Sequence, residues 1–142
     1  MKRLLIAIDN SISALNAAKY GLDFAKRLNL EIGIAEITTY SMGNIDAGIL
    51  PFDAEKAMQQ RAKTYIDEIK QLYPDLLIQE FVPIGKPHIE IKKIINIWGA
   101  DMLVIGHHTH SMLHKLFLKS VEAKLIANIE IPILIIPESY TI

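Results

Sequence analysis

The sequence predicts an α/β fold, with one open five-stranded parallel sheet and helices on both of its faces. Short aliphatic runs such as Leu4–Ile8 and Met102–Ile105 lack polar alternation, which is typical of strands covered on both sides. Segments with helical periodicity separate the runs, and right-handed crossovers then place the strands in one parallel sheet. The 142 residues, 51% hydrophobic and 22% charged, suit a single domain over residues 1–142.

The composition excludes several classes of protein. The net charge is −1 and the basic residues are scattered, so we expect no nucleic-acid surface. Cysteine is absent, which leaves neither disulfides nor thiolate chemistry. The run Leu4–Ile8 is too short for a signal-peptide core, and no apolar run reaches the roughly 20 residues of a membrane span. We therefore expect a soluble, cytoplasmic protein without membrane contact.

Strand and helix patterns alternate along the chain. A first helical pattern begins at Ala14 and is expected to stop at Asn29, and Asp53 is expected to cap a second helix. Pro87 suits the first turn of a third helix, which Gly99 closes. Ser120 is expected to cap the last helix. The strands are expected at Leu4–Ile8, Leu30–Ile37, Leu76–Val82, Met102–Ile105 and Ile131–Pro137.

The segment Thr38–Phe52 follows neither periodicity and is predicted to be a long loop. Loops of this length in compact domains are usually functional or mobile. Because the segment follows a strand of a parallel sheet, we expect it beside the ligand cleft, as a mobile lid or a partner contact.

Two residues mark the carboxyl ends of predicted strands, where open α/β sheets bind ligands. Asp9 ends the first strand. Gly106 is expected to end the strand Met102–Ile105, because a residue without Cβ lets the backbone turn sharply and approach a ligand closely. A second interpretation of Asp9 is that its carboxylate caps the turn into the first helix through N–H groups near Ser11.

Four motifs together are similar to those of the universal stress protein family, over essentially the whole chain. They are Leu5-Ile6-Ala7-Ile8-Asp9, Gly85-Lys86-Pro87 before a helix, Ala100-Asp101-Met102-Leu103-Val104-Ile105-Gly106, and Ile131-Pro132-Ile133-Leu134-Ile135-Ile136-Pro137. The resemblance implies the strand order 3-2-1-4-5.

The resemblance also implies a choice between two branches of the family. The ATP-binding branch carries Gly-x2-Gly-x9-Gly-Ser/Thr, whose glycines let backbone N–H groups hold phosphates. Here Gly106 and Ser120 match that motif, but Thr109 and Lys119 replace its other two glycines. Gly106-His107-His108, Lys115-Leu116 and Ser120 instead resemble the UspA-type branch, which is not known for binding ATP.

A degenerate nucleotide site is the alternative. A Cβ at position 109 fills space that a phosphate would need, yet the Lys119 ammonium could itself attract phosphate. The residues of such a site would be Asp9, Ile37, Gly106, Thr109, Lys119 and Ser120.

A histidine cluster lies in the loop after Gly106. Imidazole is a common metal ligand, but no carboxylate or cysteine stands inside the cluster, so polar surface histidines are the simpler interpretation. A pH response near the histidine pKa of about 6.5 is a further hypothesis. The four residues are His107, His108, His110 and His114.

Catalysis is not indicated by the sequence. The serines and threonines lack a nucleophile-elbow sequence, which argues against a hydrolytic triad. An ATPase or phosphotransferase would lack an evident general base and metal ligands. We expect no enzyme activity and no required cofactor, with ATP as the alternative.

The last predicted strand has the composition of a homodimer interface. Its run Ile133, Leu134, Ile135 and Ile136 carries no charge and no proline, and it lies at an edge in the implied strand order. Exposed apolar edges favour aggregation unless they are covered, and pairing with a second copy covers them. The competing hypothesis is that Glu138–Ile142 folds back over the edge.

These observations favour a cytoplasmic UspA-type stress protein that acts as a dimeric interaction module. Its partners would be a second copy of the chain and an unidentified protein. The second hypothesis is an adenine-nucleotide-binding switch that uses the cleft between Asp9 and the Gly106–Ser120 loop.

Overall fold

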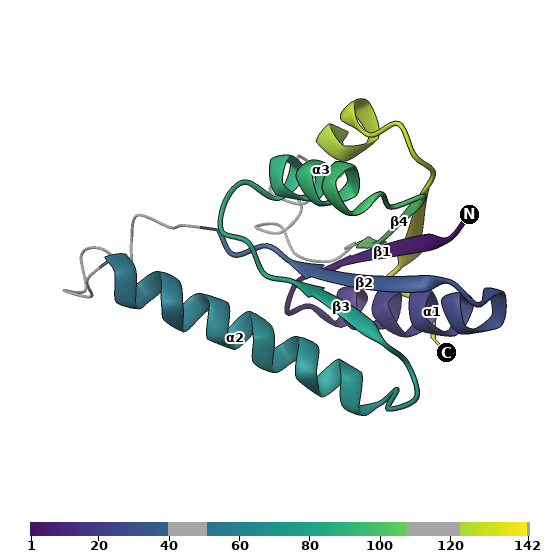
Figure 1. Cartoon of the computed structure of the whole chain (residues 1–142), viewed down its shortest axis with the longest axis horizontal. Helices are drawn as coiled ribbons and strands as arrows, with labels where there is room; N and C mark the ends of the chain where they lie inside the picture. The colour runs from purple at the N-terminus through teal and green to yellow at the C-terminus, as the bar shows by residue number, and fades with distance from the viewer. Residues whose placement is uncertain (40–50, 108–122, 142) are drawn as a thin grey trace.

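A computed structural model of the chain describes residues 1–39, 51–107 and 123–141 (Figure 1). Five parallel strands form one sheet in the order β3-β2-β1-β4-β5, which confirms the predicted fold class and strand order. The strands are β1 (Arg3–Ile8), β2 (Glu31–Glu36), β3 (Ile78–Phe81), β4 (Met102–His107) and β5 (Ile133–Pro137). The helices are α1 (Ile12–Leu28), α2 (Pro51–Gln71) and α3 (Pro87–Trp98), and residues 123–128 are also helical.

The sheet lies between two layers of helix. Helices α1 and α2 cover one face, and α3 with helical residues 123–128 covers the other (Figure 1). Successive residues of β1 alternate between the two cores, because neighbouring side chains of a strand point to opposite faces. Leu4 and Ile6 join the core under α1, whereas Leu5 joins the core under α3. No helix of the described residues is long and apolar enough to cross a membrane.

The predicted helix ends at Asn29 and Gly99 are confirmed. Both residues adopt left-handed backbone conformations, with φ of 53° and 75°, and their N–H groups bond to carbonyls of the preceding turn. Glycine and asparagine tolerate this conformation better than other residues do. The chain therefore leaves α1 and α3 sharply and enters the next strand within a few residues.

Several predicted boundaries were wrong. Helix α2 begins at Pro51, because proline suits a first helical turn, so Asp53 lies inside the helix. Strand β3 is shorter than the expected Leu76–Val82, since Leu76 closes a turn with Tyr73 and Leu77 is 95% exposed. Strand β5 begins two residues later than expected, at Ile133.

The predicted loop Thr38–Phe52 is only partly comparable with the structure. Thr38 is buried and forms a parallel bridge with Ile84, and the segment's last two residues are helical. The loop prediction was therefore wrong at both ends. Residues 40–50 lie outside the described residues, so the predicted mobility remains a prediction.

Candidate functional site: the carboxyl end of the sheet

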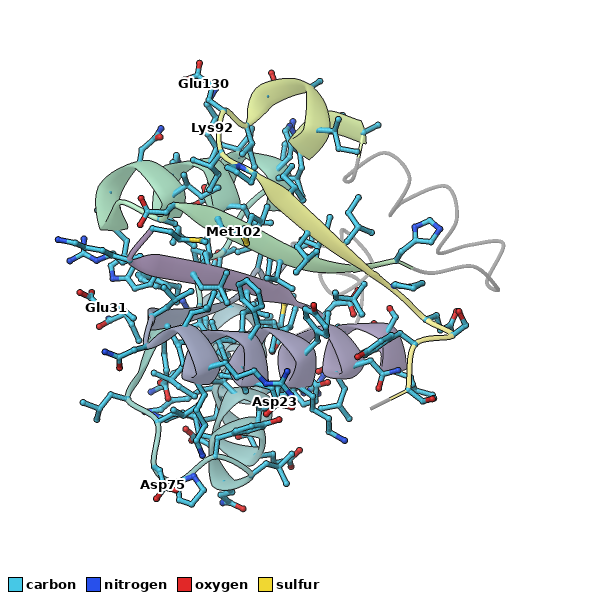
Figure 2. All side chains as sticks on the ribbon, turned by 90° about the vertical axis from the view of Figure 1, so that its right-hand side faces the viewer. Asp23, Glu31, Asp75, Lys92, Met102 and Glu130 are labelled. Atoms are coloured by element: carbon cyan, nitrogen blue, oxygen red, sulfur yellow. The ribbon has the colours of Figure 1, made fainter. Side chains whose placement is uncertain are left out.

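The candidate site lies where β1, β2 and β4 end. In Figure 2, Glu31 and Met102 mark the amino ends of β2 and β4, and the carboxyl ends of these strands lie on the opposite side of the molecule. Of the residues proposed from the sequence, Asp9 and Ile37 lie just beyond the ends of β1 and β2, and Gly106 lies one residue before the end of β4. Thr109, Lys119 and Ser120 lie outside the described residues.

Asp9 organises the turn between β1 and α1. Its Oδ1 accepts hydrogen bonds from the N–H of Ser11, at 3.0 Å, and from the Ser11 hydroxyl. The Ser11 Oγ in turn accepts a hydrogen bond from the N–H of Ala14 at 3.1 Å, so Ser11 is the N-cap of α1. The capping interpretation of Asp9 is therefore confirmed in modified form, because Asp9 positions the residue that caps the helix.

Gly106 lies inside β4, so the expectation that it ends the strand was wrong. The strand continues to His107, and Gly106 pairs with Ile136 of β5. A Cβ on Gly106 would lie 2.7 Å from the carbonyl oxygen of Ser13 and 3.0 Å from the N of Ala14. Because Gly106 has no side chain, the first turn of α1 packs directly against it. The sequence analysis had expected a ligand at this position.

Glu36, which the sequence analysis did not single out, is a buried carboxyl group at the end of β2. It pairs with Ile8 across the sheet, is only 7% exposed, and its Oε2 has no hydrogen-bond partner among the described residues. Burial, and secondly the negative charge of Asp9, raise the pKa of Glu36 from 4.5 to about 7. Near neutral pH this carboxyl group is therefore divided between its neutral and charged forms.

Tyr65 of α2 belongs to the same group of residues. Burial raises the pKa of its hydroxyl, and the negative charges of Glu36, Asp9 and Glu68 raise it further. The phenol therefore remains protonated and can donate a hydrogen bond. Three elements thus supply one acid–phenol cluster, which consists of Asp9, Glu36 and Tyr65.

The chain beyond β2 is held firmly as far as Thr38. The Thr38 N–H and hydroxyl both donate to the carbonyl of Pro83, at 3.0 and 3.2 Å, and its carbonyl accepts from Gly85 at 3.0 Å. Ile37 packs against the core under α3, on the sheet face opposite α1 and α2. Ile37 is thus a core residue on the α3 side of this end of the sheet, and its place in the predicted nucleotide site remains a prediction.

The predicted histidine site cannot be assembled from the described residues. His107 ends β4, and its three companions lie outside the described ranges, as do Ser111 and Lys115. Within residues 1–39, 51–107 and 123–141, no group of three or more His, Cys, Asp or Glu side chains could hold a metal ion. Metal binding by the histidine loop remains a hypothesis.

The predicted interface strand lies at the sheet edge. Ile136 is buried in the core under α1, Ile133 and Leu134 are half-buried, and Ile135 is 38% exposed. The competing hypothesis, a cover of this edge by Glu138–Ile142, can be compared with the structure only as far as residue 141. Residues 138–141 turn onto α1, where Asn16 Nδ2 donates to the carbonyls of Glu138 and Tyr140 at 3.4 and 3.1 Å.

The fold and the site define an open α/β protein with a polar end at the point where the strand order reverses, the place where such sheets bind ligands. The sequence profile described as "Universal stress protein family" matches residues 1–137. The chain belongs to the universal stress protein family.

Individual relatives agree with this assignment. Universal stress protein MJ0577 of Methanocaldococcus jannaschii is 27% identical over 86 residues, which are 59% of this chain and about half (53%) of that protein. The solved structure of MJ0577 superposes with a TM-score of 0.81 at 22% identity, over 99% of this chain and 98% of that one.

Two further solved structures share the fold. Universal stress protein UspA from Lactobacillus plantarum has a TM-score of 0.79 at 15% identity, over 95% of this chain and 97% of that one. A universal stress protein in complex with cAMP has a TM-score of 0.67 at 21% identity, over 97% and 98%.

Proposed function

We propose that this chain is a UspA-type universal stress protein that acts in the cytoplasm as a dimeric interaction module, without required ATP and without catalysis. The observation that carries the proposal is the packing of Gly106. Two of the three glycines of the phosphate-binding motif are replaced in the sequence. The remaining glycine is explained by its contact with the Ser13 backbone, so it needs no phosphate to account for it.

The charge at this end of the sheet supports the same proposal. Asp9 lies just beyond the end of β1, and Glu36, the last residue of β2, gains negative charge as the pH rises through about 7. A triphosphate would meet like charge here, and like charges are costly in partly buried sites. Any phosphate binding would then depend on groups of residues 108–122.

A thermal-shift experiment tests the absence of a required nucleotide. A ligand at roughly 100 times its Kd stabilises a fold by about 2.7 kcal/mol, which raises the melting temperature by several degrees. We expect millimolar ATP to leave the melting temperature unchanged and purified protein to lack adenine absorbance. The double variant Thr109→Gly, Lys119→Gly should gain a shift. A clear shift of the unmodified protein in micromolar ATP would contradict the proposal.

The dimer is proposed through β5. As the last strand of the sheet, β5 offers one row of backbone groups to a further strand, and Ile135 adds an exposed aliphatic side chain at its middle. A two-fold axis beside β5 would pair the strand with its own copy. This arrangement gives hydrogen-bond partners to the outer backbone groups of β5 and joins two sheets into one.

Two neighbouring substitutions separate the interface from the core. Ile135→Lys should yield a folded monomer, because the charge would face the partner. Ile136→Lys should unfold the chain, because Ile136 is only 4% exposed. Light scattering and circular dichroism measure the two outcomes. An unmodified protein that scatters as a monomer at micromolar concentration would rule out the dimer.

An adenine-nucleotide switch is the second candidate. It is favoured by the likeness of the fold to the universal stress protein in complex with cAMP. The polar group at the carboxyl end, with the Tyr65 hydroxyl as a donor, offers hydrogen bonds to a nucleoside. Titration of the unmodified protein with cAMP and AMP, followed by calorimetry, tests this candidate, and the Asp9→Ala variant is its control.

A further inference from the structure

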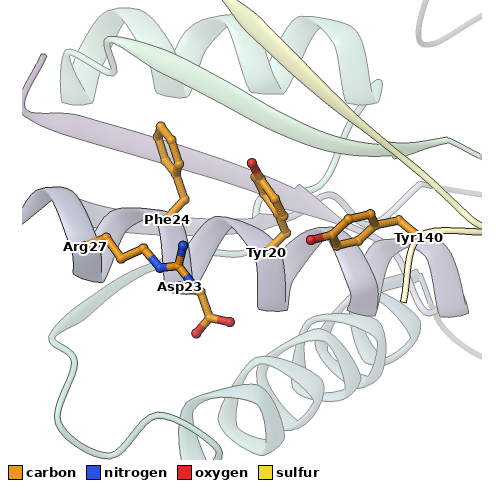
Figure 3. A pocket seen from close by; sticks show the side chains of 5 residues that line it. All are labelled: Tyr20, Asp23, Phe24, Arg27 and Tyr140. Atoms are coloured by element: carbon orange, nitrogen blue, oxygen red, sulfur yellow. The ribbon is translucent and has the colours of Figure 1, made fainter. Parts of the chain in front are cut away.

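A row of aromatic side chains lies along α1 beside β5 (Figure 3). Tyr20 and Phe24 stack with their ring centres 6.2 Å apart, and Tyr140 meets the Tyr20 ring edge-on at 5.5 Å. With Asp23 and Arg27 they line a shallow hollow of about 110 Å³. The term "aromatic row" is used below for Tyr20, Phe24 and Tyr140.

The position of the row is fixed by hydrogen bonds and packing. Asn16 holds the carbonyl of Tyr140 at 3.1 Å, and the Tyr140 N–H closes a turn onto the carbonyl of Pro137 at the end of β5. Tyr20 and Phe24 pack on the same core cluster as Leu134 of β5. The aromatic row therefore borders the free edge of the sheet, on the face that α1 covers.

We propose that the aromatic row is the second half of the dimer interface and receives a second copy of this chain. The inference rests on the proposed β5 pairing and extends it from a strand edge to a surface. With a two-fold axis normal to the sheet, both α1 helices lie on the same face, one on each side of the joined β5 strands. The two aromatic rows then fill the groove between the helices.

The area that a stable dimer requires supports this extension. A five-residue strand is about 17 Å long, and with a layer spacing of about 10 Å its edge covers roughly 170 Å². Stable interfaces bury about 800 Å² per partner. Strand pairing alone thus falls several-fold short. Tyr140 is still 40% exposed in the single chain and Tyr20 and Phe24 are only half-buried, so the rings offer further apolar area beside the strand.

The composition of the row suits a contact between two copies. Tyrosine and phenylalanine are enriched at the centres of interfaces, because each ring buries a large area while few torsions are fixed. Asp23 and Arg27 line the hollow beside the rings, and the exposed Arg27 gives the surface a polar rim. A self-complementary patch of this kind fits an isologous contact.

Cysteine labelling tests the inference directly, because the natural chain contains no cysteine. Tyr140→Cys places one thiol in the row, and Leu77→Cys places one beside β3 at the opposite edge of the sheet, where Leu77 is 95% exposed. Each reduced variant is labelled with a bulky maleimide over a range of protein concentrations, and light scattering follows the oligomeric state in the same samples. We expect the labelling rate of Cys at position 140 to fall at least about tenfold as the dimer forms. Labelling at position 77 should not change.

The other outcomes distinguish this inference from the proposed dimer. If light scattering shows a dimer while Cys at position 140 is labelled as fast as in the same variant carrying Ile135→Lys, which is expected to be a monomer, the inference is wrong and β5 pairing stands. If labelling is also slow in samples that light scattering shows to be monomeric, a segment of the same chain covers the row, and the inference is again wrong. If the protein is a monomer throughout, both proposals fail. The variant Tyr20→Ser provides a second measurement, with at least about a tenfold rise in the dimer Kd expected.

Discussion

The two ends of the sheet are built from opposite kinds of interaction. At the amino end, Arg3 Nε pairs with Glu31 Oε2 at 2.7 Å, and Arg3 also donates to the carbonyl of Trp98 at 2.6 Å. The guanidinium lies 5.6 Å from the centre of the Trp98 ring. One side chain thus joins β1, β2 and α3 through opposite charge, a hydrogen bond and a cation–π contact.

Asp101 completes the amino end. Its Oδ2 accepts the N–H groups of Lys2 and Arg3, at 2.7 and 2.9 Å, and these two hydrogen bonds lower the pKa of Asp101 below its ordinary 3.8. The carboxyl end holds carboxyl groups as well, but there burial and like charge raise the pKa of Glu36. The amino end therefore favours the charged form of Asp101, whereas the carboxyl end disfavours the charged form of Glu36.

This difference supports the proposal that the functional site lies at the carboxyl end of the sheet. Buried groups with perturbed pKa values are retained where a site uses them, and the carboxyl ends of parallel strands are the ligand-binding end of such sheets. At the amino end, the contacts of Arg3 hold β1, β2 and α3 together. Four substitutions, given from the largest expected effect to the smallest, test the comparison.

Gly106→Ala should lower the free energy of unfolding by about 2–3 kcal/mol. The new Cβ would lie 2.7 Å from the backbone oxygen of Ser13, so the first turn of α1 would have to move. Gly21→Ala is the matched control, because its Cβ would meet side-chain atoms of Ile6, at 2.8 Å, and no backbone, and alanine favours a helix. Urea unfolding measures both variants. Equal stability of Gly106→Ala and the unmodified protein would refute the close-packing argument.

Glu36→Gln should raise the free energy of unfolding by about 1–3 kcal/mol at pH 8, and by little at pH 4. The folded-state pKa of about 7 exceeds the ordinary 4.5, so the folded protein binds more protons between these values. Its stability then falls as the pH rises from about 4.5 to 7 and is level above. Glutamine removes this slope. Glu68→Gln, an exposed change on α2, is the control, and a destabilised Glu36→Gln at pH 8 would contradict the assignment.

The sequence was sufficient where a local pattern decides the structure. Asn29 and Gly99 end helices because few other residue types accept a left-handed conformation, and the aliphatic runs form the strands because both sheet faces are covered. The strand order, by contrast, came from the family resemblance. The strand prediction was wrong at Leu77, because the sequence does not distinguish an apolar residue exposed in a connection from one buried in the core.

The candidate site was predicted less well, because its properties arise between distant segments. The run Ile34-Ala35-Glu36-Ile37 identifies a strand that ends in a polar residue, and this was the only available signal for Glu36. Its raised pKa depends on Asp9 and on burial, neither of which is local to the run. For Gly106 the sequence predicted a strand end and the close approach of a ligand, whereas the packed structure continues the strand and places the α1 backbone against it.

Arg3→Lys should lower the free energy of unfolding by about 1 kcal/mol. A lysine reaches either Glu31 or the Trp98 carbonyl but does not present the planar group that bonds to both. Lys93→Ala is the control, since Lys93 forms an exposed pair with Glu90 on one helix at 3.0 Å. Chemical unfolding near pH 7 measures the two variants. A larger loss of stability for Lys93→Ala than for Arg3→Lys would contradict the role of Arg3 in joining β1, β2 and α3.

Asp101→Asn should have the smallest effect near neutral pH, because an amide oxygen still accepts one or both of the N–H groups of Lys2 and Arg3. Its pH dependence carries the information. The lowered pKa of Asp101 gives stability that is complete above about 3.8 and is lost as the pH falls through the folded-state value. The loss of stability in Asp101→Asn should therefore shrink in acid, whereas the gain of stability in Glu36→Gln should grow toward alkaline pH. Melting curves from pH 3 to pH 8 record both trends, with Asp75→Asn as the control for loss of one surface charge. If both variants lost stability relative to the unmodified protein as the pH rises, or both gained it, the two ends of the sheet would not differ in the way described.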